Sequence, residues 1–387
     1  MASAAPQRPV SLGALAWYFF RLGLTGFGGP VALANYIRRD LADRYRWISA
    51  AEYDEGLAIA TACPGPLAYQ LGVYSGYVTN GPFGAIVVAI AFALAPFLIV
   101  VAVAALYTKF GSTPQLRGIF HGVGPVVIAI IARSCWDLGR KTLGREWPAY
   151  SVAAISCAIT IAVQQELIAL FLTAGALGIF LFYRPERSAP TSSPPPLNLL
   201  SATPILVNAT QSVALPKIFW FFFKTGLLVF GSGLVIVPFL KAYVVDQYHW
   251  LSNQAFLDAV AVGIVSPGPV VITATFVGFL TGRFAGALAA TLGIFSPSLI
   301  FVMLGTPVLR RYRRNGRVQG FVRGITVAVV GVLLGTSYLV ARSTIHDVLG
   351  IVLLIVALAI LWSRWRIAEP LLVAGGAIVG LATAAYR

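Results

Sequence analysis

The chain has 387 residues, of which only 11% are charged, and its mean hydropathy is +0.83. A soluble domain carries about a quarter charged residues, so this composition excludes an ordinary soluble fold. The net charge of +15 is typical of nucleic-acid-binding proteins, but here the arginines lie in short stretches between apolar runs, as in membrane proteins, so we expect no nucleic-acid binding.

Apolar runs of about 20 residues, long enough to cross a bilayer, recur along the chain. They are too long and too uniformly apolar for barrel strands, so the sequence predicts an all-α polytopic membrane protein. The N-terminus lacks the compact apolar stretch of a signal peptide. The apolar runs include Ala85–Leu106, Gly118–Ile131, Val152–Tyr183, Ala285–Leu304, Ile325–Val340 and Val348–Trp362.

The first motif runs from Arg21 to Pro30, with the sequence RLGLTGFGGP. A cation inside an apolar helix costs about 3 kcal/mol on insertion scales, so a functional use for Arg21 is expected. Gly28 and Gly29 leave backbone amides open to close approach, which suits an oxyanion. The alternative is that Arg21 reaches the membrane interface and the glycines pack helices closely.

A structural motif and an acidic residue follow. In Asp43-x-Tyr-x-Trp-Ile-Ser49 the aromatic residues favour the membrane interface, and Ser49 with Glu52 forms a helix-capping box. Glu55 begins the segment that leads to the next break. It is either a carboxylate that carries a coupling proton or an acidic residue that stabilises a helix start.

The second functional motif is Cys63-Pro64-Gly65-Pro66, with Gln70 close behind it. Two prolines around a glycine break a helix, and the helix that restarts after Pro66 offers free amides. Transporters place such breaks at mid-membrane, where half-helix N-termini face anionic substrates. The alternative is a purely structural kink.

A Pro- and Ser-rich segment, Arg187–Asn198, lies near the midpoint and predicts a linker over residues 185–213 between halves at 11–184 and 214–387. The halves repeat one another: an offset of 203 residues relates Phe20 to Phe223 and continues without a gap to Pro66 and Pro269. The identical positions are Phe20, Gly23, Leu24, Phe27, Gly28, Asp43, Tyr45, Trp47, Ser49, Ala58, Pro64, Gly65 and Pro66, each with its partner 203 residues later.

The repeat gives every candidate a second copy. Lys224 corresponds to Arg21, and Asp258 corresponds to Glu55. Further on the offset is 202, and it pairs His121 with Arg323. These two are either secondary pathway residues or interface groups, and we favour the second interpretation. The second break and the second glycine motif supply Gly231, Ser266, Pro267, Gly268 and Pro269. We expect the two breaks and the two cations to lie toward one shared centre.

The basic loops predict opposite orientations for the halves. The loop with Arg140, Lys141 and Arg145 and the exit at Arg184 and Arg187 are expected to be cytoplasmic. In the second half the basic loops lie at Arg310–Arg317 and Arg364–Arg366. Their repeat equivalents in the first half are expected to lie outside the cell. Inverted repeats need an odd number of crossings per half. We therefore predict about ten full transmembrane helices plus one broken or re-entrant segment per half, either Ala14–Tyr36 or Leu57–Tyr77, with both termini outside.

The stretches FRLGLTGFGG, WIS and CPGPLAYQ, followed by a degenerate second copy, resemble the chromate transporter (CHR) family in its two-domain bacterial form. The resemblance implies a transporter that exports chromate from the bacterial cytoplasm, with sulfate as a competing analogue, driven by the membrane potential or the proton gradient. Many members have Ser-Phe-Gly-Gly-Pro followed closely by a histidine. Here Gly26 precedes Phe27, and residues 33–35 hold no histidine.

The sequence thus predicts a secondary active transporter in the bacterial inner membrane that exports chromate and confers chromate resistance. The alternative is uptake or exchange of sulfate or another tetrahedral oxyanion. An enzyme, a cofactor or a metal site is not expected, because the three histidines are scattered and the three cysteines form no CxxC pair. A homodimer is left open. The expected substrate-binding residues are Arg21, Lys224, Gly28, Gly29, Gly231, Cys63, Pro64, Gly65, Pro66, Gln70, Ser266, Pro267, Gly268 and Pro269, and the expected proton-coupling residues are Glu55 and Asp258.

Overall fold

The structure is a computed structural model that describes residues 10–26, 29–110, 113–163, 167–182, 214–231, 233, 236–312, 316–345, 347–363, 367 and 369–384. The predicted linker and Gly28 lie outside these residues. We call residues 10–182 the first half and residues 214–384 the second half.

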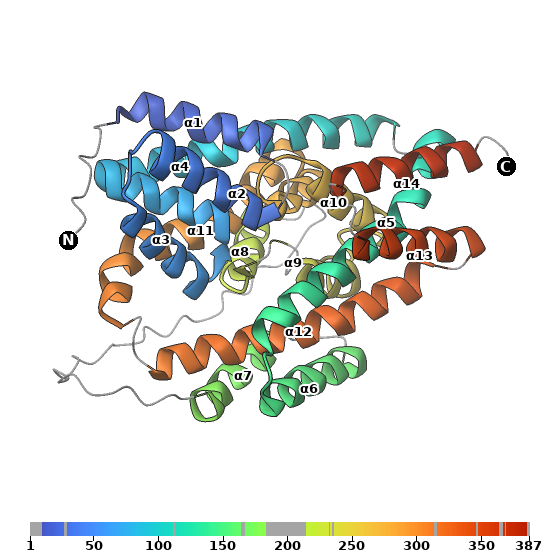
Figure 1. Ribbon diagram of the computed structural model, residues 1–387. Helices are drawn as coiled ribbons and strands as arrows, with labels where there is room; N and C mark the ends of the chain where they lie inside the picture. Colours follow the sequence, from blue (N-terminus) through green and yellow to red (C-terminus); the bar gives the residue numbers. More distant parts are fainter. Residues whose placement is uncertain are drawn as a thin grey trace.

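Both halves are almost entirely helical (Figure 1). The first half contains α1 (Leu12–Thr25), α2 (Gly29–Ile37), the π-helix η1 (Arg38–Arg44), α3 (Ala50–Ala62), the short strand β1 (Gly65–Pro66), α4 (Leu67–Phe110), α5 (Pro114–Thr142), α6 (Trp147–Val163) and α7 (Leu167–Leu181). The second half contains α8 (Leu215–Gly226), β2 (Phe230–Gly231), α9 (Ile236–Phe239), the π-helix η3 (Leu240–Gln247), α10 (Asn253–Val265), the 3₁₀-helix η4 (Val270–Ile272), α11 (Thr273–Tyr312), α12 (Gly316–Thr344), α13 (Val348–Trp362) and α14 (Glu369–Ala384).

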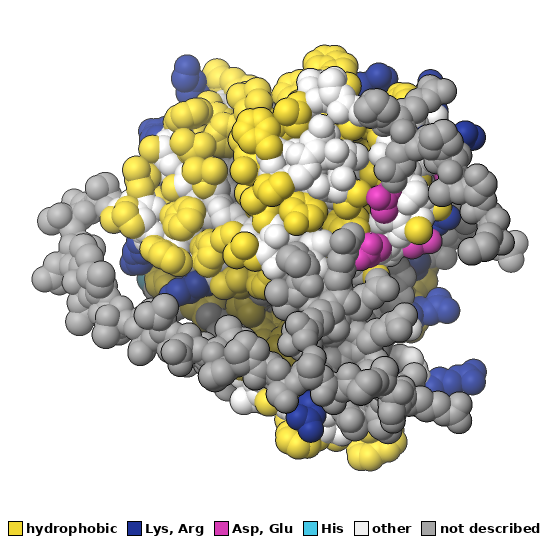
Figure 2. Space-filling model, turned by 90° about the vertical axis from the view of Figure 1, so that its left-hand side faces the viewer, with side chains coloured by type: hydrophobic (Ala, Val, Ile, Leu, Met, Phe, Trp, Pro, Cys, Tyr) yellow, Lys and Arg dark blue, Asp and Glu magenta, His cyan; other side chains and the backbone are white. Residues whose placement is uncertain are grey.

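Four helical segments among the described residues are long and apolar enough to cross a membrane: Leu67–Phe110, His121–Arg140, Val270–Leu304 and Gln319–Leu339. Five further apolar helices are shorter. Figure 2 shows a face on which hydrophobic side chains form a broad area, with most of the visible lysines and arginines at its borders. These features are those of a multi-pass α-helical membrane protein. The predicted number of about ten full crossings stays a prediction.

The longest helix, α4, folds back on itself at Asn80 and Gly81. Asn80 has φ −135° and Gly81 has φ +64°, which interrupts the helix. Tyr69 donates a hydrogen bond to the carbonyl oxygen of Ala89 over 3.3 Å. In a straight helix these residues would be about 30 Å apart, so residues 67–79 and 82–110 form an antiparallel pair. In α11, Gly282 and Arg283, 202 residues later, interrupt the helix with similar dihedral angles.

Both sequence motifs lie at the tips of helical hairpins. Gly56 of α3 packs against Tyr74 of α4, so the chain reverses at the break between them. Tyr18 of α1 donates a hydrogen bond of 3.4 Å to the carbonyl oxygen of Tyr36 in α2, so the chain also reverses at the glycine motif. The helices α1, α2 and α3 have 14, 9 and 13 residues, which is shorter than the about 20 residues that cross a bilayer.

The halves are interlocked through α5 and α12, which run antiparallel. His121 near the start of α5 pairs with Asp347, just after α12, and Glu146, just after α5, pairs with Arg323 near the start of α12. Small residues let neighbouring helices approach closely: Gly122 of α5 lies against Gly376 of α14, and the equivalent Gly324 of α12 lies against Ala174 of α7. Each half therefore packs its last helices on the other half's long helix. His121 and Arg323 thus each pair with an acidic side chain from the other half.

Candidate functional site

The helix breaks of the two halves meet in the middle of the molecule. Gly65 donates its backbone N–H to the carbonyl oxygen of Val229, and Gly268 donates its own to Gly26 over 2.9 Å. The offset of 203 relates Gly65 to Gly268 and Gly26 to Val229, so these are the same contact made twice. Next to the first contact, β1 and β2 pair as parallel strands, with Gly65 opposite Phe230.

The backbone at both breaks requires glycine. Gly65 has φ +139° and Gly268 has φ +91°, values that residues with a Cβ rarely adopt. A Cβ at Gly65 would collide with Ser298 Oγ and with the Gln70 amide, and a Cβ at Gly268 would lie 3.1 Å from Pro96 Cγ. At both breaks the Pro-Gly-Pro motif therefore combines a positive φ, which favours glycine, with close contacts to the neighbouring hairpins.

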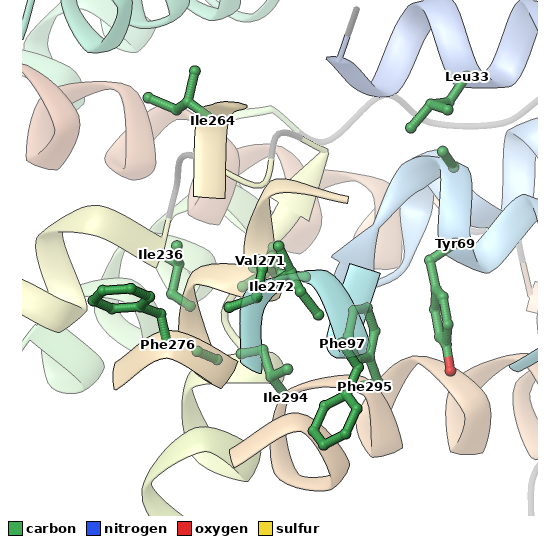
Figure 3. Packing of buried hydrophobic residues seen from close by; sticks show 14 of the residues in the cluster. Leu33, Tyr69, Phe97, Ile236, Ile264, Val271, Ile272, Phe276, Ile294 and Phe295 are labelled. Carbon is green, nitrogen blue, oxygen red and sulfur yellow. The ribbon is translucent and has the colours of Figure 1, made fainter. Parts of the chain in front are cut away.

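A small cavity of about 10 Å³ lies between the tips, with room for about one water molecule. Among the described residues its lining holds no charged side chain, and consists of Pro30, Leu33, Pro66, Ala68, Gly233, Gly268, Pro269 and Val270. The packing around it comes from both halves, with Tyr69 of α4 and Phe295 of α11 in contact at a ring-centroid distance of 4.5 Å (Figure 3).

A cationic cavity of about 230 Å³ opens beside the first glycine motif; we call it cavity A. Arg21 is exposed in it, and no ion pair links Arg21 to another described residue. Arg39 instead donates to the Asp40 carboxylate over 2.9 Å, which neutralises part of the charge. The lining residues are Tyr18, Arg21, Leu22, Thr25, Gly26, Tyr36, Arg39, Asp40, Arg44 and Tyr45.

A second cationic cavity, cavity B, has a volume of about 250 Å³ and lies beside the second glycine motif. It holds the exposed Lys224 together with Lys217, whose ammonium group lies 4.7 Å from the ring centre of Tyr248. The lining residues are Lys217, Trp220, Phe221, Lys224, Thr225, Leu228, Tyr243 and Tyr248. The offset of 203 maps Arg21 to Lys224 and Tyr45 to Tyr248, so the two cavities correspond.

The breaks converge as expected, but the cations do not. Cavities A and B have no lining residue in common, so Arg21 and Lys224 lie in separate spaces. Arg21 lies on the short helix α1, and Lys224 lies on the short helix α8. Gly26, which accepts the hydrogen bond from Gly268, also lines cavity A.

The remaining candidates of the first break lie around its tip. Cys63 is buried, Pro64 is half-buried and Gln70 is fully buried, with its Nε2 donating to the Pro64 carbonyl oxygen. Gly29 begins α2, and Gly231 pairs with Pro66 across the strands.

In the second break, the buried Ser266 donates its hydroxyl to the Gly263 carbonyl oxygen over 3.2 Å. Pro267, with Ser266, lines a different cavity of about 290 Å³ whose other walls are apolar.

The two acidic candidates have different surroundings. Glu55 is half-buried on α3, whereas Asp258 on α10 has only 2% of its surface exposed. The Asp258 carboxylate accepts hydrogen bonds from Tyr107 Oη over 2.7 Å and from Gln254 Nε2 over 2.9 Å. Tyr107 comes from α4 of the first half.

Sequence reasoning did not single out Tyr107 or Ser298, which both lie in apolar helices. The repeat could have drawn attention to Ser298, because the offset of 202 aligns this polar residue with the apolar Pro96. In the part of the chain that the structure describes, no group of three His, Cys, Asp or Glu side chains is arranged to hold a metal ion.

Comparisons with known proteins agree on one family. A sequence model of the family described as chromate transporter matches twice, at residues 13–179 and 216–381. The chain is 41% identical to a probable chromate transport protein of Synechococcus elongatus, over 96% of this chain and 95% of that one. It is 40% identical to a chromate transport protein of Cupriavidus metallidurans (95% and 92%) and 32% identical to one of Pseudomonas aeruginosa (88% and 83%). No solved structure matches.

Proposed function

The chain belongs to the chromate transporter family, and we propose that it is a secondary active transporter that exports chromate from the cytoplasm across the bacterial inner membrane. Export of the toxic dianion would confer chromate resistance. The observation that carries the proposal is the meeting of the helix breaks, with Gly65 bonded to Val229 and Gly268 bonded to Gly26, between two cationic cavities.

The cationic cavities suit an oxyanion substrate. A tetrahedral dianion needs counter-charge and hydrogen-bond donors in place of water. Arg21 with Arg44 in cavity A, and Lys224 with Lys217 in cavity B, supply the charge. The backbone N–H groups of Gly65 and Gly268 would supply donors near the midpoint of the pathway once their bonds to Val229 and Gly26 open.

We further propose that the halves are inverted repeats and that cavities A and B open to opposite sides of the membrane. The antiparallel course of α5 and α12, which occupy equivalent positions in the repeat, supports the inversion. The anion would pass between the cavities when one half rocks against the other and the tips separate. A homodimer is not required by this scheme, since one chain supplies both cavities.

The membrane potential favours this direction of transport. Moving a negative charge out of a cell whose interior is negative releases about 2.3 kcal/mol per elementary charge per 100 mV. Proton coupling would add to this through Asp258 rather than Glu55, because Asp258 is buried, is held by hydrogen bonds, and has no ion pair with a described residue. An ionisable side chain buried in a membrane protein is costly to keep and commonly marks a proton or ion pathway.

Uptake or exchange of sulfate, a tetrahedral dianion like chromate, is the alternative. The deciding experiment measures chromate and sulfate flux in right-side-out and inside-out vesicles from expressing cells. We expect chromate to enter inside-out vesicles, with sulfate competing, and expressing cells to accumulate less chromate than control cells. Equal accumulation with and without the protein, and equal vesicle flux, would rule the proposal out.

A further inference from the structure

Two side chains buried beside the first helix break each carry a polar atom that has no hydrogen-bond partner among the described residues. Gln70 of α4 and Ser298 of α11 each have 0% of their surface exposed. Ser298 Oγ and Gln70 Oε1 find no partner among the described residues. A buried polar group left unsatisfied costs about 1–3 kcal/mol. The Ser298 hydroxyl can donate a hydrogen bond, whereas Gln70 Oε1 can only accept one, so the unused donor beside this break is the Ser298 hydroxyl.

The Ser298 hydroxyl and the Nε2 end of the Gln70 amide lie against the same backbone position. A Cβ built on Gly65 would collide with Ser298 Oγ on one side and with the Gln70 amide on the other. Gly65 itself carries the N–H that bonds to Val229. Three groups able to donate hydrogen bonds thus converge at the tip, namely the Ser298 hydroxyl, the Gln70 amide and the Gly65 N–H. The adjoining Pro66 lines the central cavity.

The second half repeats the contact between the glycine of the break and the opposite hairpin, but it does not repeat the chemistry of that contact. Pro96 stands at the position equivalent to Ser298, and its ring carbons lie 3.1 and 3.3 Å from a Cβ built on Gly268. Thr273, equivalent to Gln70, donates its hydroxyl to the Val270 carbonyl oxygen over 2.9 Å and is satisfied. An apolar contact therefore suffices to pack a glycine break in this fold, so the polar groups at Gly65 are not a requirement of packing.

We propose that Ser298 and Gln70, together with the Gly65 N–H, form an oxyanion subsite that binds one oxygen of the transported tetrahedral anion. The inference rests on the proposed transport of an oxyanion. The Ser298 hydroxyl and the second hydrogen of Gln70 Nε2 donate to the anion, and the Gly65 N–H joins them when its bond to Val229 opens as the tips separate. Substrate recognition at the midpoint is then asymmetric, because the first break supplies side-chain donors and the second does not.

The test is equilibrium binding of chromate to the purified full-length chain, combined with flux in proteoliposomes. For Ser298→Ala we expect the Kd and the KM for chromate to rise about ten- to hundredfold, as for the loss of a hydrogen bond to a charged group. Ser298→Thr keeps a hydroxyl and should retain part of the affinity. The matched control is Ser296→Ala, one half-turn away, whose hydroxyl is already bonded to the Leu292 carbonyl oxygen; it should bind as the wild type does.

Thermal unfolding separates a binding role from a structural one. Removing an unsatisfied hydroxyl should leave the Tm of Ser298→Ala equal to or above that of the wild type, while binding is lost. A variant with unchanged chromate affinity overturns the subsite, and so does a variant whose Tm and affinity fall together. If the wild type binds neither chromate nor sulfate, the proposed function fails as well. If the wild type binds and Ser298→Ala binds equally, the subsite alone is wrong.

Discussion

The imidazole of His121 in α5 lies 2.9 Å from the carboxylate of Asp347, just before α13, and this contact joins the two halves. Arg323 and Glu146 make the corresponding contact at the other end of the interface, over 3.0 Å. Because the chain contributes each partner from a different half, the pairs position α5 against α12, around which the last helices of both halves pack.

The Arg323–Glu146 pair predicts a charge-reversal rescue. Both side chains are partly exposed, so Glu146→Arg alone should lower the free energy of unfolding by about 1 kcal/mol or slightly more, since it also adds like-charge repulsion. The double variant Glu146→Arg/Arg323→Glu should recover most of this loss. Thermal unfolding of the purified protein in detergent measures both. If the double variant is no more stable than the sum of the single variants, the two residues do not interact.

We predict that removing the cation of either cavity, A or B, is enough to reduce transport. Arg21→Ala and Lys224→Ala should each reduce kcat/KM for chromate about tenfold, because each removes the counter-charge on one side of the pathway. The reduction should be larger at low salt, where charges are less screened. Arg140→Ala, which removes an exposed cation of α5 outside both cavities, should have no effect. Full activity in both cavity variants, with normal membrane expression, would remove the counter-charge role.

The two helix breaks predict that a methyl group at either glycine stops transport. Gly65→Ala and Gly268→Ala combine an unfavourable φ with a steric clash at the contact between the tips, and we expect flux to fall below a tenth of the wild-type value. Gly144→Ala is the matched control. Gly144 also has a positive φ, +58°, but a Cβ there would meet nothing within 4 Å. This variant should lose only about 1–2 kcal/mol of stability and keep its flux. Equal flux in all three variants would show that the helix breaks are not part of the transport pathway.

Because Asp258 is the buried carboxylate, we predict that replacing it changes how transport is coupled to the proton gradient. Asp258→Asn keeps the shape and removes the titratable proton, so chromate flux should no longer respond to an imposed pH gradient while its response to the membrane potential persists. Tyr107→Phe, which removes one hydrogen bond to the carboxylate, should shift the pH dependence of flux without abolishing it. Glu55→Gln should behave as the wild type. Proteoliposomes with separately imposed gradients provide the measurement, and an unchanged response in Asp258→Asn would exclude the residue from coupling.

Much of the local structure could be predicted from the residues alone. Pro-Gly-Pro removes two amide donors and favours a helix break wherever it stands, and both breaks are found where the motif predicts them. Ser49 and Glu52 form the predicted capping box. Composition similarly predicted a helical membrane protein, since apolar runs of this length have few other stable solutions.

The long-range relations depend on contacts that no local pattern encodes. The repeat indicates that Gly65 and Gly268 are equivalent, but only the packing of the hairpins decides that Gly65 bonds to Val229 and Gly268 to Gly26. The same packing places Arg21 and Lys224 in separate cavities and brings Ser298 to Gly65 from α11. These residues are more than 150 positions from their partners, so side-chain volume and helix approach in three dimensions decide which of them meet. Residue types therefore determined where the helices break and which cations are available, whereas the tertiary structure determined which break, cation and hydroxyl group lie together.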